Sequence, residues 1–195
     1  MSSIAKTENK ILMSQARDAL SERWGFVVGT MFVYNIFIIL FCALLMLGFS
    51  FFIIFGPMSV GLCIFSLSIS RKQDSKLSQI FNGFNKFGVS LGAYLLQTIL
   101  IFLWSLLLII PGIIAALSYS MTFFIIAENE SIGPLEAITK SKEMMDGNKW
   151  KFFCLGLRFL GWYLLCILTL GIGFLWLMPY MAVSYAKFYD DISQN

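Results

Sequence analysis

Long uncharged, apolar stretches separated by short charged segments make up most of the chain. No charged residue occurs within residues 24–70, 87–127 or 159–186. One membrane-spanning helix needs about 20 apolar residues, so each of the first two stretches is long enough for two spans joined by a tight turn. The third stretch also holds two spans if it is extended back to Phe152, which places Arg158 inside the membrane.

This pattern predicts an all-α, polytopic membrane protein with about six transmembrane helices. The predicted spans are residues 25–47, 51–70, 88–109, 112–127, 151–169 and 172–189. If each apolar stretch is a helical hairpin, all charged segments lie on one side of the membrane; these are residues 1–23, 71–86, 128–151 and 187–195. Because they hold every Lys and Arg except Arg158, the positive-inside rule predicts that both termini are cytoplasmic.

The composition agrees with a membrane setting. Of the 195 residues, 58% are apolar and 13% are charged, whereas about a quarter of a soluble domain is charged. A soluble domain of this size has too little interior to bury so much apolar surface. The net charge of +3 is small and is divided among several segments, so nucleic acid is not expected as a partner.

A pattern with three copies runs along the chain. The basic–aromatic pairs Arg23-Trp24, Lys86-Phe87 and Lys149-Trp150 precede the apolar stretches, and their aromatic residues are 63 positions apart both times. Each pair follows apolar residues at helical spacing, as at Leu12, Ala16 and Leu20. The alternative is coincidence, because basic and aromatic residues are common at any membrane interface.

From this pattern we predict one membrane domain, residues 1–195. It has an amphipathic cytoplasmic N-terminus at residues 1–23 and candidate repeats at 24–86, 87–149 and 150–195. The amphipathic segments are interpreted as linkers that lie at the membrane interface, with docking to a partner as the alternative.

Few residues at membrane depth carry chemistry. The chain has no His, and no Asp or Glu lies within the core of a predicted span. General acid–base catalysis, a metal centre and a cofactor are therefore not expected. Glu128, Asp190 and Asp191 lie at span ends, too far apart in sequence to predict a carboxylate pair. We expect no enzymatic activity.

The candidate residues for binding a ligand or lipid are basic and aromatic. They are Arg158, Trp150, Arg23, Trp24, Lys86 and Lys149. An arginine at the bilayer centre costs at least about 2.5 kcal/mol. Arg158 is interpreted as a residue that snorkels or that pairs with Glu128 or Glu143. The alternative is contact with an anionic headgroup or substrate, because guanidinium binds phosphate in a bidentate manner.

The remaining candidates are polar or helix-breaking residues inside the spans. Asn35 and Gln97 are expected to form interhelical hydrogen bonds. Pro57, Pro111-Gly112 and Pro179 predict turns or kinks, with a broken-helix site as the alternative. Glycines near the starts of the odd-numbered spans are expected to allow close helix packing; they are Gly25, Gly29, Gly88, Gly92, Gly156 and Gly161.

The second half of the chain resembles a known bacterial family. The motifs that carry the resemblance are IPGIIAALSYS (110–120), EAI (136–138), SKEMMDGNKW (141–150), TLGIGF (169–174), MPYM (178–181) and FYDD (188–191). Together they resemble the integral-membrane family called domain of unknown function 975, over most of the chain and most clearly from Pro111 to Asp191. The resemblance implies a protein of the bacterial cytoplasmic membrane, from a Gram-positive lineage. It implies no activity, cofactor or catalytic residue.

Two functions agree with these observations. The first is a non-enzymatic membrane protein that binds, moves or protects against membrane-active amphiphiles, with membrane lipids and a lipid or antimicrobial peptide such as a bacteriocin as its partners. The second is a membrane scaffold, or an accessory subunit of a transporter or another membrane complex, with a membrane protein as its partner. A channel is disfavoured because few polar residues are available to line a pore.

Overall fold

The computed structural model describes residues 7–45, 49–129, 131–169 and 171–193, with side chains outside 41–53. In these ranges every regular element is a helix and there is no strand, which confirms the predicted all-α class. The elements are α1 (Asn9–Leu20), α2 (Trp24–Leu45), α3 (Phe49–Ser70), the 3-10 helix η1 (Leu77–Lys86), α4 (Phe87–Leu107), α5 (Ile109–Ser118), α6 (Thr122–Glu128), α7 (Pro134–Met144), α8 (Lys149–Leu168) and α9 (Phe174–Ser193).

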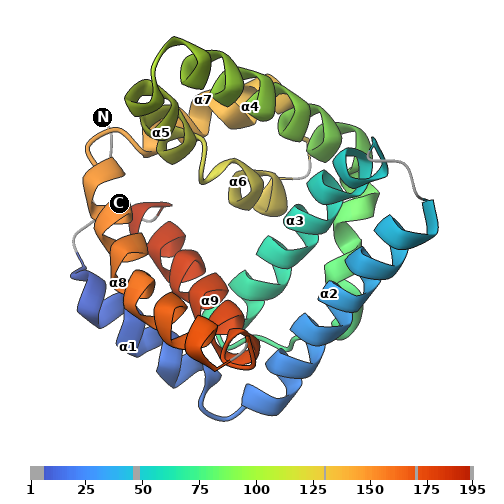
Figure 1. The fold of residues 1–195 in the computed structure, drawn as a ribbon, viewed down its shortest axis with the longest axis vertical. Helices are drawn as coiled ribbons and strands as arrows, with labels where there is room; N and C mark the ends of the chain where they lie inside the picture. Colours follow the sequence, from blue (N-terminus) through green and yellow to red (C-terminus); the bar gives the residue numbers. More distant parts are fainter. Residues whose placement is uncertain (1–6, 46–48, 130, 170, 194–195) are drawn as a thin grey trace.

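The helices form a ring of three groups (Figure 1). Helices α2 and α3 lie on one side, α4, α5 and α7 on a second, and α1, α8 and α9 on a third, with α6 toward the centre. Helix α3 connects the three groups, because it contacts α1, α2, η1, α4, α6 and α9. One short helix followed by two longer helical segments occurs three times along the chain, if α5 and α6 are taken together. The three-copy repeat itself stays a prediction.

The short helix α1 shows why amphipathic spacing leads to docking. Leu12, Ala16 and Leu20 recur every four residues, so they share one face of the helix. All three are buried, and α1 packs mainly against α9. The apolar face of α1 is therefore covered by the chain itself.

Large apolar side chains cover the outside of the candidate membrane spans. Within the described residues, three helices are long and apolar enough to cross a membrane: Leu77–Leu107, Ile109–Glu128 and Lys149–Leu168. Asn9–Leu20 with Trp24–Leu40 would make a fourth, although a bend of 95° separates them. At the α4–α5 turn, residues 106–110 are each 66–76% exposed. Soluble monomers rarely expose contiguous apolar patches of this kind, so these helices are compatible with a membrane protein.

The predicted count of six spans exceeds the three or four candidates in the described residues. Helix α9 is not among these candidates, because its second half carries the charged residues Lys187, Asp190 and Asp191. The described side chains of α3 contribute only the shorter apolar helix Ile54–Ser70. Six spans therefore stay a prediction.

The closest helix contacts occur at glycines that the sequence did not single out. A Cβ placed on Gly61 of α3 would lie 1.7 Å from the carbonyl oxygen of Ile80, and one on Gly83 would lie 1.9 Å from that of Pro57. Helix η1 can therefore pack directly against the backbone of α3. At the predicted Gly112, a Cβ would lie 2.9 Å from the Cα of Ser105, so this residue does permit close packing of α5 on α4.

The expectation of close packing is wrong for five of the six predicted glycines. A Cβ would meet nothing within 4 Å at Gly25, Gly29, Gly88, Gly156 or Gly161. Most of these glycines lie on exposed helix faces, which explains the open space around them. Only Gly92 has a close neighbour, a side-chain carbon of Pro134 at 3.0 Å from the added Cβ.

The prolines lie in continuous helices. Pro57 and Pro179 are inside α3 and α9, and Pro111 occupies the first turn of α5, where a missing N–H is tolerated. The structure therefore favours kinks and a helix start over a broken-helix site at these prolines.

The predicted fourth span is broken elsewhere, between α5 and α6. The hydroxyl of Ser141 on α7 donates to the carbonyl oxygen of Ser118 at 2.9 Å and accepts the N–H of Met121 at 3.2 Å. Ser141 thereby satisfies backbone groups that the break leaves without helical partners. The same bonds fix α7 against the middle of the predicted span.

Candidate functional site

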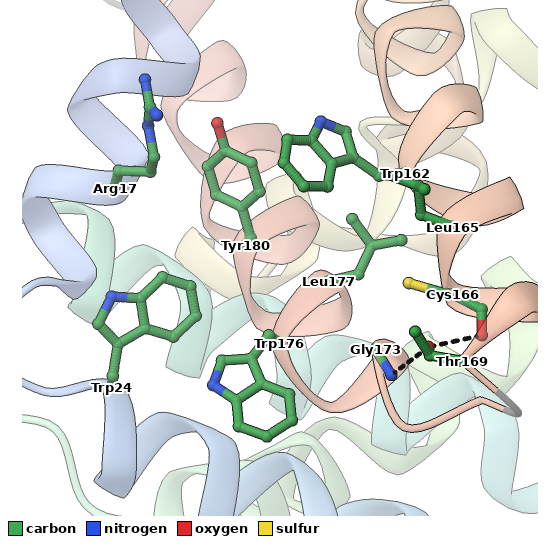
Figure 2. Close-up of a pocket in the computed structure, with 10 residues that line it drawn as sticks. All are labelled: Arg17, Trp24, Trp162, Leu165, Cys166, Thr169, Gly173, Trp176, Leu177 and Tyr180. Atoms are coloured by element: carbon green, nitrogen blue, oxygen red, sulfur yellow. Dashed lines mark hydrogen bonds between the residues drawn. The ribbon is translucent and has the colours of Figure 1, made fainter.

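A pocket of about 360 Å³ lies between the α1–α2 corner and the α8–α9 hairpin (Figure 2). We call it the tryptophan pocket. It is lined by Arg17, Trp24, Trp162, Leu165, Cys166, Thr169, Gly173, Trp176, Leu177 and Tyr180. Three of the five Trp of the chain therefore line one cavity, with the basic side chain of Arg17 at its edge.

A tight turn between α8 and α9 builds one wall of the tryptophan pocket. The hydroxyl of Thr169 donates to the carbonyl oxygen of Cys166 at 3.0 Å and accepts the N–H of Gly173 at 3.2 Å. Gly171 adopts a φ of 89°, a left-handed conformation that favours glycine. A Cβ on Gly173 would lie 2.7 Å from the sulfur of Cys166. The glycines of the predicted TLGIGF motif therefore allow this close reversal of the chain.

Three polar groups of the tryptophan pocket lie toward one end of it. Figure 2 shows the guanidinium of Arg17, the hydroxyl of Tyr180 and the indole nitrogen of Trp162 toward the same side, and Trp176 toward the other. The Tyr180 hydroxyl donates to the carbonyl oxygen of Met13 at 3.2 Å. Among the described residues, Arg17 has no hydrogen-bond or ion-pair partner. The pocket thus offers an unpaired cation beside an apolar, aromatic interior.

A second polar site, the charged cluster, joins the ends of three helices. It consists of Ser70, Arg71, Glu128, Tyr189 and Asp190. The Nη2 of Arg71 donates to Asp190 Oδ1 at 2.6 Å and also contacts Glu128 Oε1. Ser70 donates to Asp190 Oδ2 at 2.9 Å, and Tyr189 donates to Glu128 Oε2 at 2.7 Å. Glu128 and Asp190 are far apart in sequence, but both contact Arg71, because α3, α6 and α9 end at the same place. The expectation that sequence distance separates these carboxylates is therefore wrong.

The electrostatics of the charged cluster keep Arg71 protonated. Partial desolvation lowers the pKa of Arg71, but hydrogen bonds to Asp190 and Glu128 raise it more, so the pKa lies above its ordinary value. Both carboxylates are occupied by donors. The arrangement therefore holds the ends of α3, α6 and α9 together.

A neighbouring set of contacts binds the residues before and at the start of α1 to the end of α9 and the start of α8. Asp191 accepts hydrogen bonds from the N–H and hydroxyl of Thr7 at 3.2 and 2.5 Å, and it forms an ion pair with Lys151 at 3.3 Å. The side-chain amide of Asn9 donates to the carbonyl oxygen of Lys151 at 2.9 Å. The helix ends at Thr7, Lys151 and Asp191 thus lie side by side.

The structure places Arg158 and Trp150 on the outside of α8. Arg158 is exposed and has no ion pair or hydrogen bond within the part of the chain that the structure describes. Glu128 binds Arg71 instead, and Glu143 forms no ion pair with any described residue, so the predicted pairing of Arg158 with either residue is wrong. Trp150 is 73% exposed, with its ring 5.6 Å from that of Phe153.

The other predicted basic and aromatic residues are dispersed. Trp24 lines the tryptophan pocket, and Nη1 of Arg23 donates to the carbonyl oxygen of Gln73 at 2.6 Å. The ammonium of Lys86 donates to three carbonyl oxygens at the end of α6, at 2.8–3.2 Å, which is a helix C-terminal cap. Lys149 lines a separate cleft. These candidates therefore do not form one site, and the sequence did not single out Arg17.

The two predicted intramembrane polar residues differ in their contacts. The amide of Asn35 donates to the carbonyl oxygen of Met31 at 2.7 Å and lies 3.8 Å from the sulfur of Met178 on α9, so it makes one weak interhelical contact. The Oε1 of Gln97 is buried and has no hydrogen-bond partner in the described ranges. The expected interhelical bond is wrong for this atom.

A third cavity, of about 370 Å³, lies where α2, α3, α6, α8 and α9 meet. Its lining includes the hydroxyl-bearing residues Tyr34, Ser59, Ser66, Tyr163 and Tyr185, and none of its lining residues is charged. This cavity was not predictable from the sequence, because these hydroxyls come from four separate helices, α2, α3, α8 and α9.

The fold and these cavities define a helical protein with several candidate membrane spans and an aromatic pocket edged by a cation. The family model described as "Protein of unknown function (DUF975)" matches residues 106–195. The chain is therefore similar to that family from the end of α4 to its last residue, which confirms the resemblance found in the motifs. No curated protein and no solved structure matches the chain.

Proposed function

We propose that this chain is a polytopic protein of a bacterial cytoplasmic membrane that binds an anionic, membrane-active amphiphile in the tryptophan pocket and catalyses no reaction. The observation that carries the proposal is the unpaired guanidinium of Arg17 at the edge of a cavity walled by three indoles. The family of unknown function that matches residues 106–195 is the one whose motifs imply a bacterial membrane protein, and this match supports the setting.

The exposed apolar surface supports the membrane setting. Leu106, Ile110 and Leu168 are each at least 71% exposed, and burying an apolar side chain stabilises by about 1.5–3 kcal/mol. Lipid would cover this surface without requiring a second protein. A partner of unknown identity would have to cover several helices at once.

The topology that we propose has both termini and the ends of α3, α6 and α9 on the cytoplasmic side. Its support is the convergence of Arg71, Glu128 and Asp190, which follow or end separate predicted spans. Charged ends that bind one another directly cannot lie on opposite sides of a bilayer about 30 Å thick.

The tryptophan pocket has the size and polarity of a site for a single-chain amphiphile. Its volume of about 360 Å³ is near the lower limit of ligand pockets, about 300–1,000 Å³. An acyl chain would contact the indoles, and its anionic head would accept hydrogen bonds from Arg17, whose charge-assisted bonds are stronger than neutral ones.

The scaffold alternative is less well supported. Docking through amphipathic helices needs a free apolar face, and the face of α1 formed by Leu12, Ala16 and Leu20 is buried within the chain. Enzymatic function also lacks support. The carboxylates of Glu128 and Asp190 are both engaged, and the described residues contain no group of three or more His, Cys, Asp or Glu that could hold a metal ion.

The test compares Arg17→Gln with Arg158→Gln. Both remove one exposed Arg without an ion pair, but only Arg17 lines the tryptophan pocket. The probes are myristate and its uncharged counterpart monomyristin, and their binding to the purified full chain in detergent is measured by native mass spectrometry. We expect Arg17→Gln to weaken myristate binding about tenfold or more, the loss of one charge-assisted hydrogen bond.

In this experiment Arg158→Gln should bind myristate as the unmodified chain does, and all three proteins should bind monomyristin equally. Equal myristate binding by the Arg17→Gln protein would overturn the proposed site.

A further inference from the structure

A second cleft, on another part of the surface, brings two lysines together. It has a volume of about 210 Å³ and lies among α4, α5, α7 and the start of α8. Lys142 and Lys149 line it together with the apolar groups of Trp104, Pro111 and Ile114. We call it the lysine cleft. It shares no lining residue with the tryptophan pocket.

The local fold explains why the two lysines meet. Helix α7 ends at Met144 and α8 begins at Lys149. The turn between them contains Gly147 with a φ of 76°, and the side chain of Asn148 donates to the carbonyl oxygen of Met144 at 3.0 Å. Ser141, next to Lys142, is bound to the break between α5 and α6. The turn and this anchor therefore hold both lysines against α5.

The charge of the lysine cleft is not neutralised by the protein. Neither Lys142 nor Lys149 has a hydrogen bond or ion pair within the described ranges, and no acidic residue is among those that line the cleft. By contrast, Arg71 and Lys151 each bind a carboxylate. Two like charges in one cleft repel each other, and a bound anion would relieve that repulsion.

We propose that the lysine cleft binds the phosphate of an anionic lipid and prefers a phosphomonoester to a phosphodiester. A phosphomonoester carries about −1.5 to −2 charges at pH 7, which matches two ammonium groups, whereas a diester carries one. The lipid chain would lie along Ile114 and Trp104 toward the α4–α5 turn. At that turn Leu108 and Ile110 are 66% and 71% exposed.

The test measures lipid retention by the full chain in detergent, using native mass spectrometry. The probes are phosphatidic acid, a monoester, phosphatidylglycerol, an anionic diester, and phosphatidylcholine, a zwitterion. The variant is Lys142→Gln combined with Lys149→Gln, and the matched control is Lys140→Gln, an exposed lysine of α7 that does not line the cleft. Each Lys near an anionic lipid contributes about 1 kcal/mol, so we expect the double variant to retain phosphatidic acid about 30-fold less well.

The control and the unmodified chain should retain phosphatidic acid more strongly than phosphatidylglycerol, and phosphatidylcholine least. Equal retention by the double variant would overturn the site, and equal retention of the mono- and diester would overturn the preference. Displacement of phosphatidic acid by millimolar inorganic phosphate would replace the lipid with a soluble phosphate as the ligand.

Two further measurements separate loss of lipid binding at the lysine cleft from loss of folding and from loss of binding at the tryptophan pocket. The single variants Lys142→Gln and Lys149→Gln, each with its thermal midpoint, separate loss of binding from loss of folding. The double variant is also measured in an Arg17→Gln background, where the same loss of about 30-fold is expected because the lysine cleft shares no lining residue with the tryptophan pocket. Failure of this inference and failure of the proposed function are therefore distinguishable.

Discussion

Two groups of basic residues in this chain differ in their partners. Arg71 and Lys151 bind carboxylates, and Lys86 binds the carbonyl oxygens at the end of α6. These contacts join helices. In contrast, Arg17 and Lys149 line cavities and have no ionic partner among the described residues. The second group therefore carries the proposed binding functions.

Single glycines provide a sharp test of the packing. At Gly83 a Cβ would lie 1.9 Å from a carbonyl oxygen of the α3 backbone, whereas at Gly156 it would meet nothing within 4 Å. Overpacking costs about 1–3 kcal/mol, and Ala in place of Gly inside an exposed helix stabilises by about 0.5–1 kcal/mol. We expect Gly83→Ala to lower the midpoint of thermal unfolding in detergent and Gly156→Ala to raise it slightly. A Gly83→Ala protein as stable as the unmodified chain would show that η1 does not pack on α3 in this way.

At the scale of the helices, the side chains of the charged cluster connect the ends of α3, α6 and α9. Arg71 contacts both Glu128 and Asp190, so its loss would leave two carboxylates close together without a cation. The side chain of Asp190 is only 12% exposed, which makes its hydrogen bonds to Arg71 costly to lose.

For this reason we expect Arg71→Gln to destabilise the fold by about 1.5–3 kcal/mol, the range for a hydrogen bond to a charged group. The measurement is unfolding by guanidinium chloride in detergent, followed by far-UV circular dichroism. Arg158→Gln is the matched control, because Arg158 is exposed and unpaired in the described ranges, and its stability should be unchanged. Equal stability of the two variants would mean that the cluster does not hold the helix ends.

The helices were largely predictable from the sequence because their signals are local. Each predicted span coincides, within four residues, with a helix or with the α5–α6 pair. The break near Tyr119 was not predictable, because no Pro or Gly marks it and it depends on Ser141 of α7. For the same reason the charged cluster and the tryptophan pocket were missed. Arg71 and Asp190, or Arg17 and Trp162, meet only when distant helices pack.

For the whole molecule, the arrangement of charge and apolar surface has one consistent explanation. Residues at the α4–α5 turn and at the end of α8 are among the most exposed apolar residues, while the ends of α3, α6 and α9 meet in the charged cluster. The proposed membrane setting, with lipid over this apolar surface and the charged cluster outside the lipid, agrees with both observations. The proposed binding sites depend on this setting.

Cysteine labelling in intact cells tests the setting most directly. With Cys42, Cys63, Cys154 and Cys166 replaced by Ala, single cysteines are placed at the exposed positions Lys76 and Glu143. A membrane-impermeant maleimide should label Lys76→Cys and Glu143→Cys only after the cells are permeabilised. Labelling of either Lys76→Cys or Glu143→Cys in intact cells would contradict the proposed topology, and release of the protein from membranes by alkaline carbonate would contradict the membrane setting itself.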